Sequence, residues 1–308
     1  IKGAKLAREN NIDLILSIGG GSVLDMSKLI KAFINNQSKE AMILEGHEEV
    51  SDCNIPIIAV PTTAGSGSEA THFAVVYRDD KKYSVADKSL KPDAAVLDGS
   101  LVKSATKYQR ACYALDALSQ SIESAWAVSS SEDSIKISLK AIEMCRMHIK
   151  NYVNECSDYD SQKMLEASNL AGEAINITKT TAAHAWSYGF TSNHNIPHGH
   201  AVWLTLPKIF QLHLNGKDNS MNDARGPDHL KRISSKIEKI LNLKSENNDI
   251  SIQLEEFLNS INIFINLNDD IGLNFQQREK LSTMVNVQRM LNNPISFHKE
   301  QIDYIFNL

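Results

Sequence analysis

The sequence predicts an α/β domain with an open parallel sheet, followed by a domain built from helices alone. Short apolar runs that end in glycine- or hydroxyl-rich turns fill the first third of the chain, as is typical of buried strands in such a sheet. From about residue 104 the apolar residues recur with helical spacing, and strand signals almost vanish. We therefore expect an α/β domain over residues 1–103 and a helical domain over residues 104–308.

These two patterns also predict the individual elements. Strands are expected at residues 12–18, 55–60, 74–77 and 94–97. Helices are expected at residues 1–10, 23–30, 108–128, 132–153, 160–177, 179–191 and 199–206. The polar segment 216–229, which contains Gly and Pro, is expected to be an exposed loop. Because a helix that leads directly into a buried strand usually follows another strand, we also expect at least one β-α unit before residue 1.

The composition excludes several classes of protein. Hydrophobic residues make up 42% and charged residues 22%, which is typical of a globular chain. The net charge of −5 leaves no electrostatic footprint for nucleic acid or for an anionic membrane. The four cysteines form no C-x-x-C pair, no apolar run reaches about 18 residues, and no signal peptide is visible. We expect a cytoplasmic protein with reduced thiols.

Two glycine-rich turns follow expected strands. Glycine lets the backbone approach a ligand there, and the helix that starts at the first turn favours an anion at its N-terminus. The first turn, residues 19–22, therefore fits a pyrophosphate, although it lacks the G-x-G-x-x-G fingerprint and a sharp turn alone would also use glycine. The second, residues 62–68, strengthens the case because ligands of open sheets bind at the carboxyl ends of strands. Asp25 either orients the first turn or is simply a favourable carboxylate in the first helical turn.

The helical half carries candidate metal ligands. Four of the ten histidines lie within residues 184–200, and neutral imidazole binds borderline metals such as Zn²⁺ and Fe²⁺. Asp116 and Gln120 share one helical face, in a stretch so small and apolar that the carboxylate must be either coordinated or paired in a salt bridge. Together with His184 and His198, Asp116 would form an open site for a divalent metal. The alternative for the histidines is a polar surface loop.

As a set, four motifs resemble the iron-containing (group III) alcohol dehydrogenases over nearly the whole chain. The motifs are Gly19-Gly20-Gly21-Ser22 with Asp25 and Lys28, the run Pro61-Thr62-Thr63-Ala64-Gly65-Ser66-Gly67-Ser68-Glu69, Asp116-Ala117-Leu118, and His184 with Pro197-His198-Gly199. The resemblance implies a Rossmann-like dinucleotide-binding domain and a helical domain in a dehydroquinate synthase-like architecture, with metal and substrate in the cleft between them. It also implies NAD(P)H and a divalent metal, either Fe²⁺ or Zn²⁺, as cofactors.

The resemblance further implies roles for individual residues. Cofactor contacts would come from Gly20, Gly21, Ser22, Asp25, Thr62, Thr63, Ser66 and, on the ribose, Lys82. Metal ligands would be Asp116, Gln120, His184 and His198. Gln120 stands where the family usually has histidine, and because an amide oxygen is a harder and weaker ligand than imidazole, we expect the metal affinity or identity to differ. Tyr188 stands where a second family histidine lies near the substrate and the proton path.

Three segments resemble, in particular, the phosphonoacetaldehyde reductase branch of the family, whose members reduce phosphonoacetaldehyde to 2-hydroxyethylphosphonate in phosphonate biosynthesis. They are residues 116–124, 174–184 and 196–202. A dianionic substrate needs local donors, and the polar cluster 176–181 supplies hydroxyl, amide and ammonium groups just before His184. The candidate substrate contacts are Lys179, Thr180, Thr181 and Arg110. The alternative is a polar helix junction with an N-cap and a solvated lysine.

The expected reaction is the reduction of an aldehyde to a primary alcohol. The metal would polarise the aldehyde oxygen, nicotinamide would deliver hydride, and a proton would arrive through water by way of His200, His194 or Tyr188. Two other functions stay open, a short-chain alcohol, aldehyde or polyol dehydrogenase of the same family and a dehydroquinate synthase-like cyclase. A chain without its first β-α unit would instead be a non-catalytic product with an exposed sheet edge. The candidate partners are a small anionic aldehyde and, in a homodimer, a second copy of the chain.

Overall fold

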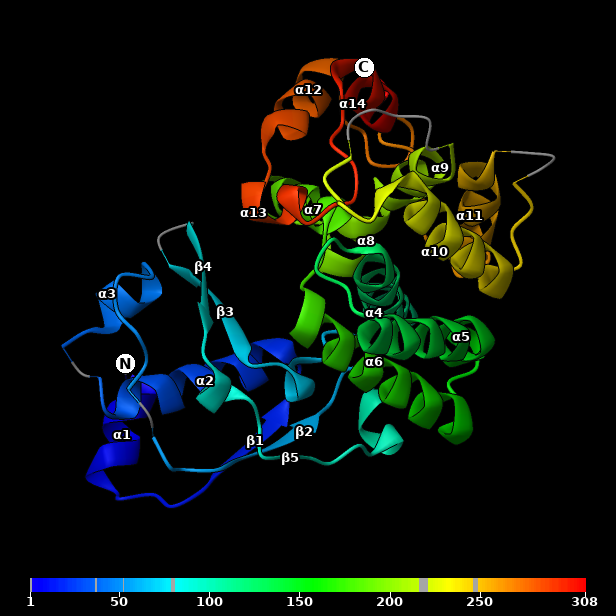
Figure 1. The fold of residues 1–308 in the computed structure, drawn as a ribbon. Helices are drawn as coiled ribbons and strands as arrows, with labels where there is room; N and C mark the ends of the chain where they lie inside the picture. The colour runs from blue at the N-terminus through cyan, green and yellow to red at the C-terminus, as the bar shows by residue number, and fades with distance from the viewer. Residues whose placement is uncertain (1, 37, 52, 79–80, 216–220, 246–248) are drawn as a thin grey trace.

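The computed structural model describes the chain except for residues 1, 37, 52, 79–80, 216–220 and 246–248. A strand-containing part and a larger helical part lie side by side (Figure 1). The last strand of the first part ends at Ala95, and the first long helix begins at Lys107. The prediction of a parallel-sheet part followed by a helical part is thus confirmed, while the boundary at residue 103 stays our proposal.

A three-stranded parallel sheet forms the centre of the first part. Its strands are β1 (Ile15–Gly19), β2 (Ile57–Pro61) and β5 (Ala94–Ala95), in the order β1-β2-β5. Gly19 lies opposite Pro61, so the turns that follow β1 and β2 start side by side at the carboxyl ends of these strands. Alternate residues of β1 are buried on the side of α2 (Gly21–Ile34), whereas Leu16 and Ile18 are more than half exposed.

A β-hairpin lies beside α2 and forms a second, antiparallel sheet. It consists of β3 (Phe73–Arg78) and β4 (Lys81–Ala86). The strand expected at 74–77 therefore exists, but the expectation that it belongs to the open parallel sheet is wrong. Strand β4 escapes a prediction from apolar runs because it opens with two lysines. The first part also contains α1 (Lys2–Glu9), α3 (Glu40–Leu44) and the 3₁₀ segments η1 (Ser68–Ala70), η2 (Lys88–Leu90) and η3 (Gly99–Val102).

The second part is a stack of helices. Their bounds are α4 (Lys107–Trp126), α5 (Glu132–Asn154), α6 (Asp158–Thr178), α7 (Ala182–His194), α8 (His198–Trp203), α9 (Leu206–Asn215), α10 (Gly226–Leu241), α11 (Ile250–Asn259), α12 (Phe275–Thr283), α13 (Val287–Leu291) and α14 (Lys299–Phe306). The long helices expected between residues 108 and 191 are all present. The expectation of a loop at 216–229 is wrong at its end, because α10 already begins at Gly226 with Pro227 in its first turn; residues 216–220 lie outside the described residues. Where the chain is described, no helix is long and apolar enough to cross a membrane.

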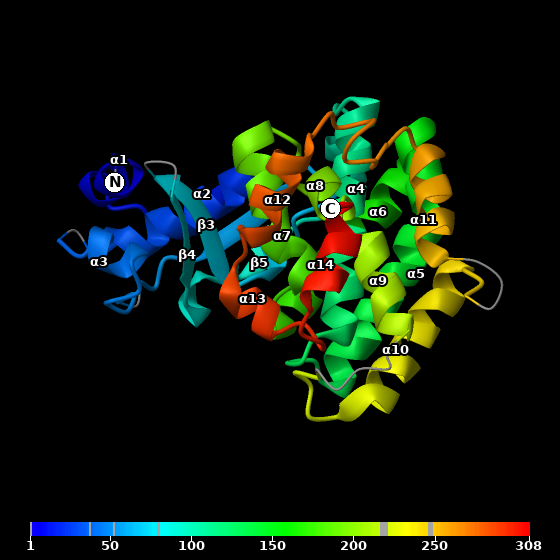
Figure 2. The same ribbon diagram turned by 90° about the horizontal axis from the view of Figure 1, so that it is seen from above.

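Helix α4 runs through the middle of the helical part (Figures 1 and 2). It is buried on nearly all sides from Ala111 to Trp126, because its many alanines and serines let α5, α6 and α8 pack closely against it. Two carboxylates of this helix, Asp116 and Glu123, are consequently carried into the protein interior. A buried carboxylate needs a partner, so this helix is where a polar site must be sought.

Candidate active site

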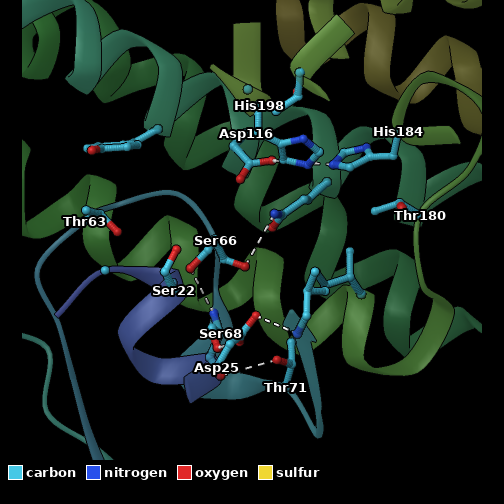
Figure 3. Close-up of a pocket in the computed structure, with 18 of the residues that line it drawn as sticks. Ser22, Asp25, Thr63, Ser66, Ser68, Thr71, Asp116, Thr180, His184 and His198 are labelled. Atoms are coloured by element: carbon cyan, nitrogen blue, oxygen red, sulfur yellow. Dashed lines mark hydrogen bonds and ion pairs between the residues drawn. The ribbon is translucent and has the colours of Figure 1, made fainter. Parts of the chain in front are cut away.

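A cleft of about 500 Å³ lies between the two parts of the molecule (Figure 3). Its loop wall is made by lining residues between 20 and 75, and its helix wall by lining residues between 112 and 199 together with Arg289. Most of the residues predicted from the sequence line it, namely Gly20, Gly21, Ser22, Asp25, Thr63, Ser66, Asp116, Gln120, Lys179, Thr180, His184, Tyr188 and His198. The fold therefore brings the two glycine-rich turns and the candidate metal ligands to one place.

The loop wall needs glycine because its two turns touch. A Cβ atom on Gly21 would lie 2.7 Å from Oγ and 2.9 Å from Cβ of Ser66, closer than such atoms approach one another. Gly20, the N-cap of the 14-residue helix α2, has slightly more room, since its Cβ would lie 3.1 Å from Cγ2 of Thr63. The N-terminus of α2 opens on the cleft beside the exposed Ser22, which suits a phosphate group.

Asp25 and Lys28 hold the loop wall together. Asp25 accepts hydrogen bonds from Oγ of Ser68 (2.5 Å) and from the backbone N–H of Val75 (2.9 Å). The ammonium group of Lys28 donates to Oγ of Ser68 (2.8 Å) and to Oγ1 of Thr71 (2.9 Å). Burial lowers the pKa of Lys28 from 10.5 to about 8. Asp25 therefore does more than favour the start of α2, because it ties the second turn and β3 to that helix.

Three side chains of the helix wall converge at one point. Asp116 of α4, His184 of α7 and His198 of α8 each place a potential ligand atom within 4.8 Å of the other two (Figure 3). Nε2 of His184 lies 3.5 Å and Nε2 of His198 lies 3.9 Å from Oδ1 of Asp116. The predicted grouping of one carboxylate with two imidazoles from distant helices is therefore present in the geometry.

The donor set at this point fits a divalent metal. Within the described part of the chain, Oδ1 of Asp116, Oε1 of Gln120 and Nε2 of His184 are buried and have no hydrogen-bond partner. Buried polar atoms are normally paired, so an unpartnered carboxylate, amide oxygen and imidazole nitrogen in one site indicate a cation. The amide nitrogen of Gln120 donates to the backbone oxygen of Ser66 at 3.4 Å, which joins the helix wall to the loop wall.

Glu123 is a functional candidate that the sequence analysis missed. Its carboxylate is fully buried and accepts hydrogen bonds from Oγ1 of Thr181 (2.8 Å), the backbone N–H of Ala183 (2.8 Å) and Nδ1 of His184. Burial alone would raise the pKa of Glu123, but His184 and these hydrogen bonds hold it below its usual range. Glu123 thus caps α7 from a different helix and leaves Nε2 of His184 directed at Asp116. Its position seven residues after Asp116, on the same face of α4, was the available signal.

Tyr188 lies in the cleft between two other groups. Its ring stacks on that of His198, with centroids 6.1 Å apart and planes 5° from parallel. The guanidinium of Arg289, on α13, lies 5.8 Å from the centroid of the same ring. Arg289 also lines the cleft and was not predicted, because α13 is a short helix without a periodic apolar pattern.

The structure does not place His200 and His194 in the cleft lining. His200 is buried, with Nε2 2.8 Å from the backbone oxygen of Phe264 and Nδ1 2.9 Å from the hydroxyl of Tyr108. His200 and His198 lie two residues apart on α8, which puts them on different faces of the helix. His194 is the last residue of α7, beyond the turn that carries Tyr188. The expected proton relay through either histidine is therefore not supported by their positions.

Three further predicted site residues, Arg110, Thr62 and Lys82, do not line the cleft or have side chains outside the described residues. The guanidinium of Arg110 donates to backbone oxygens of Tyr152 (3.1 Å) and Val153 (2.9 Å), so it fastens α5 to α4 instead of facing a substrate. Thr62 follows β2 but is absent from the described residues that line the cleft; its backbone N–H donates to Gly19. Lys82 belongs to β4, and its side chain lies outside the described residues.

The polar cluster before His184 is divided between two roles. Lys179 and Thr180 line the cleft, as expected of substrate contacts. The hydroxyl of Thr181 instead donates a hydrogen bond to the carboxylate of Glu123. Oδ1 of Asn176 accepts a hydrogen bond from the backbone N–H of His72, the residue just before β3. The expectation that Thr181 faces a substrate is therefore wrong in position, because its hydroxyl is used to hold Glu123.

Comparison with known proteins identifies the family. Residues 1–99 match the model of the iron-containing alcohol dehydrogenases, and residues 111–308 match the model described as the C-terminal part of the Fe-containing alcohol dehydrogenase family. The chain belongs to the iron-containing alcohol dehydrogenase family. The resemblance noted in the sequence is thus confirmed.

Individual relatives are more distant. The chain is 28% identical over 239 residues to phosphonoacetaldehyde reductase from Streptomyces viridochromogenes, which covers 75% of this chain and 60% of that protein. It is 32% identical over 209 residues to a probable alcohol dehydrogenase from Escherichia coli, covering 67% of this chain and 52% of that protein. The matches to these two curated relatives thus span 60% and 52% of their lengths.

Solved structures share the fold over nearly the whole chain. Sulfoacetaldehyde reductase from Bifidobacterium kashiwanohense, in complex with NAD⁺, superposes with a TM-score of 0.81 at 26% identity, covering 99% of this chain and 78% of that one. An iron-containing alcohol dehydrogenase from Thermotoga maritima has a TM-score of 0.82 at 23% identity, covering 99% and 77%. The predicted dehydroquinate synthase-like architecture, which this family shares, is confirmed.

Proposed function

We propose that this chain carries the active site of a metal-dependent NAD(P)H oxidoreductase that reduces an aldehyde to a primary alcohol, with phosphonoacetaldehyde as the substrate. One observation carries the proposal: buried potential metal-ligand atoms, which have no hydrogen-bond partner among the described residues, face a glycine-lined helix N-terminus across the cleft. A cation on one wall and a dinucleotide on the other would bring a carbonyl and a hydride donor together.

The loop wall is suited to the cofactor. The N-terminus of α2, with Gly20, Gly21 and Ser22, would receive the pyrophosphate, because its free backbone N–H groups and helix dipole favour an anion. The second turn, with Thr63 and Ser66, would then lie on the nicotinamide side of the cleft. The NAD⁺ complex of the related sulfoacetaldehyde reductase supports a nicotinamide cofactor. NADH and NADPH are both candidates.

The helix wall is suited to the metal. Asp116, His184 and His198 would hold Fe²⁺ or Zn²⁺, with the amide oxygen of Gln120 as a neutral fourth donor. When bound, the metal supplies Lewis-acid polarisation of the aldehyde carbonyl. Glu123 accepts the proton on Nδ1 of His184 in a hydrogen bond, so Nε2 keeps its lone pair for a ligand.

Tyr188 is the residue we propose for proton delivery. Of the three relay candidates, His194, His200 and Tyr188, it is the one that lines the cleft. Its ring stacks on that of His198 and lies near the guanidinium of Arg289, and these contacts would fix its place in the cleft. A water molecule between that hydroxyl and the product oxygen would complete the path.

An anionic substrate is supported by charge and by the relatives. Lys179 and Arg289 place two cations at the cleft, and Thr180 places a hydroxyl there. Two of the relatives, phosphonoacetaldehyde reductase and sulfoacetaldehyde reductase, are named for acetaldehydes that carry an anionic group. A neutral aldehyde would not form ionic contacts with Lys179 and Arg289.

The test is NADH and NADPH oxidation by the metal-loaded protein with phosphonoacetaldehyde beside butyraldehyde. We expect a higher kcat/KM for phosphonoacetaldehyde, and loss of both activities after metal removal. Equal or better turnover of butyraldehyde would contradict the phosphonate substrate and leave a short-chain alcohol dehydrogenase. No oxidation with either aldehyde would contradict the reductase proposal itself.

A further inference from the structure

We propose that the side chains of Arg289 and Lys179 form an anion clamp that binds the phosphonate end of the substrate. Asn292 would fix the positions of these two charged side chains relative to each other. The inference rests on the proposed aldehyde reduction and deepens it, because it names the residues that select an anionic substrate. The group it would recognise is a tetrahedral oxyanion such as a phosphonate or sulfonate. Neither Arg289 nor Asn292 was a predicted site residue.

The clamp lies where the cleft opens into a second hollow of about 870 Å³. The residues common to both cavities are Phe73, Lys179, Thr180, Tyr188 and Arg289. The described residues that line the second hollow include these two cations and no carboxylate. An anion at the junction would therefore meet positive charge without a competing acidic group from the hollow.

Lys179 occupies an unusual backbone conformation at this junction. It follows the last residue of α6 with φ 61° and ψ −175°, a region that glycine adopts almost exclusively. The turn is held by its neighbours, since Oγ1 of Thr178 donates to the backbone oxygen of Lys179 (2.7 Å) and Oγ of Ser129 donates to that of Thr178 (2.6 Å). Lysine is strained at such a backbone position, and strain of this kind is often found at binding sites.

Asn292 connects this turn to the helix that carries Arg289. Its side-chain N–H group donates to the backbone oxygens of Thr178 (2.8 Å) and Thr180 (3.1 Å). Asn292 is also the C-cap residue of α13, three positions after Arg289. These two hydrogen bonds tie the end of α13 to the Lys179 turn, and so help to fix the separation of Lys179 and Arg289.

Thr180 supplies a further donor between the clamp and the metal ligands. It is 2% exposed, and its Oγ1 is buried and has no hydrogen-bond partner among the described residues. Figure 3 shows it on the same side of the cleft as His184. An oxyanion at the clamp could accept a hydrogen bond from this hydroxyl while the aldehyde end reaches toward His184. Arginine is suited to such a group because its guanidinium can donate two parallel hydrogen bonds.

The central experiment measures binding and selectivity in separate assays. Phosphonoacetate, an unreactive anion with the same phosphonate end, is titrated into the metal-loaded protein by calorimetry. We expect Arg289→Gln and Lys179→Gln each to raise the Kd for phosphonoacetate by about tenfold or more, as the loss of a charge-assisted contact predicts. The ratio of kcat/KM for phosphonoacetaldehyde over butyraldehyde should fall by a similar factor, through KM more than kcat. Arg232→Gln, which removes an exposed arginine paired with Glu132 on the far helices, is the matched control and should change neither value.

Asn292→Ala tests the positioning role. It removes no charge, yet we expect it to raise the Kd for phosphonoacetate by several-fold, by about the range of one neutral hydrogen bond. In the double variant with Arg289→Gln the two effects should be less than additive, because Asn292 acts partly through Arg289. Full additivity, or an unchanged Kd in Asn292→Ala with a normal melting temperature, would overturn this role.

The outcomes separate the clamp from the reaction. If both aldehydes are reduced but Arg289→Gln and Lys179→Gln keep wild-type selectivity and phosphonoacetate affinity, the clamp is overturned and the reductase proposal stands. If neither aldehyde is reduced but phosphonoacetate binds and both variants weaken it, the clamp stands and the reaction is wrong. Weakened binding that tracks the loss of selectivity supports both.

Discussion

The two walls of the cleft use their polar groups in opposite ways. On the loop wall, Asp25, Lys28, Ser68 and Thr71 satisfy one another in a closed network of hydrogen bonds. On the helix wall, buried atoms of Asp116, Gln120, Thr180 and His184 lack hydrogen-bond partners among the described residues. Satisfied groups fix a shape, whereas unsatisfied buried groups are ready to bind. The loop wall therefore offers a rigid backbone surface and the helix wall offers ligand atoms.

Removing a ligand from the helix wall should produce the largest effect. Asp116→Ala takes away the carboxylate whose Oδ1 lies 3.5 Å from His184 and 3.9 Å from His198. We expect bound metal to be lost and aldehyde reduction to fall by about a thousandfold or more, since Lewis-acid catalysis is worth several kcal/mol. Metal content by elemental analysis and steady-state rates are the measurements. Asp160→Ala, which removes a carboxylate paired with His148 on α5, is the control and should retain metal; metal retention by both variants would refute the assignment.

Lys28 allows the closed network of the loop wall to be tested by pH. Its folded pKa of about 8 lies below the unfolded value of 10.5, so between these pH values the unfolded chain holds a proton that the folded chain has released. Stability should therefore rise with pH across this window, by up to about 3 kcal/mol from this group. We expect the wild-type free energy of unfolding to rise more steeply from pH 8 to 10.5 than that of Lys28→Met. Lys208, whose pKa is also lowered to about 8 by burial, is present in both proteins and cancels. Parallel pH profiles would show that the ammonium of Lys28 is not buried in the way described.

An effect of intermediate size is expected at Glu123, which orients His184 on the helix wall. Glu123→Gln keeps the size of the side chain but removes the charge that accepts the Nδ1 proton of His184. We expect metal affinity to fall by about 10- to 100-fold, as is typical when the group that orients a ligand histidine is changed. Thr181→Val removes one hydrogen bond to the same carboxylate and leaves the His184 contact, so its effect should be smaller. Equal metal affinities in wild type and Glu123→Gln would show that Glu123 caps α7 but does not influence metal binding.

The contrast between the walls also explains what the sequence could predict. The glycine turns and the Asp116–Gln120 face are local patterns, and each can be recognised within a few residues. Arg289 contributes through a five-residue helix whose place beside α7 is set only by tertiary packing. Arg110 lies six residues before Asp116 on the same helix, but its partners are carbonyl oxygens of α5 that become neighbours only in the fold. His200 is close to His198 in the sequence and was predicted to relay protons, but helical geometry turns the two side chains apart.

The smallest effect should come from the loop wall, where shape matters more than chemistry. Gly21→Ala places a Cβ 2.7 Å from Oγ of Ser66, so the two turns must separate slightly. We expect KM for NADH to rise by about tenfold, which corresponds to ~1.4 kcal/mol of lost cofactor binding, with little change in metal content. Gly20→Ala, whose nearest contact would be 3.1 Å from Thr63, should have a weaker effect.

A compensating substitution distinguishes crowding from loss of a cofactor contact. Ser66→Gly removes both atoms that the new methyl group would meet, so the double variant Gly21→Ala with Ser66→Gly should recover part of the lost NADH affinity. Such a recovery is expected only if Ser66→Gly relieves the crowding that Gly21→Ala creates. If Gly21 and Ser66 acted only through separate contacts with the cofactor, the second substitution would weaken NADH binding further. If the double variant binds NADH no better than Gly21→Ala alone, the contact between the new methyl group and Ser66 is not the cause of the lost affinity. The glycine would then be needed for the approach of the cofactor to the backbone, as at other phosphate-binding helix N-termini.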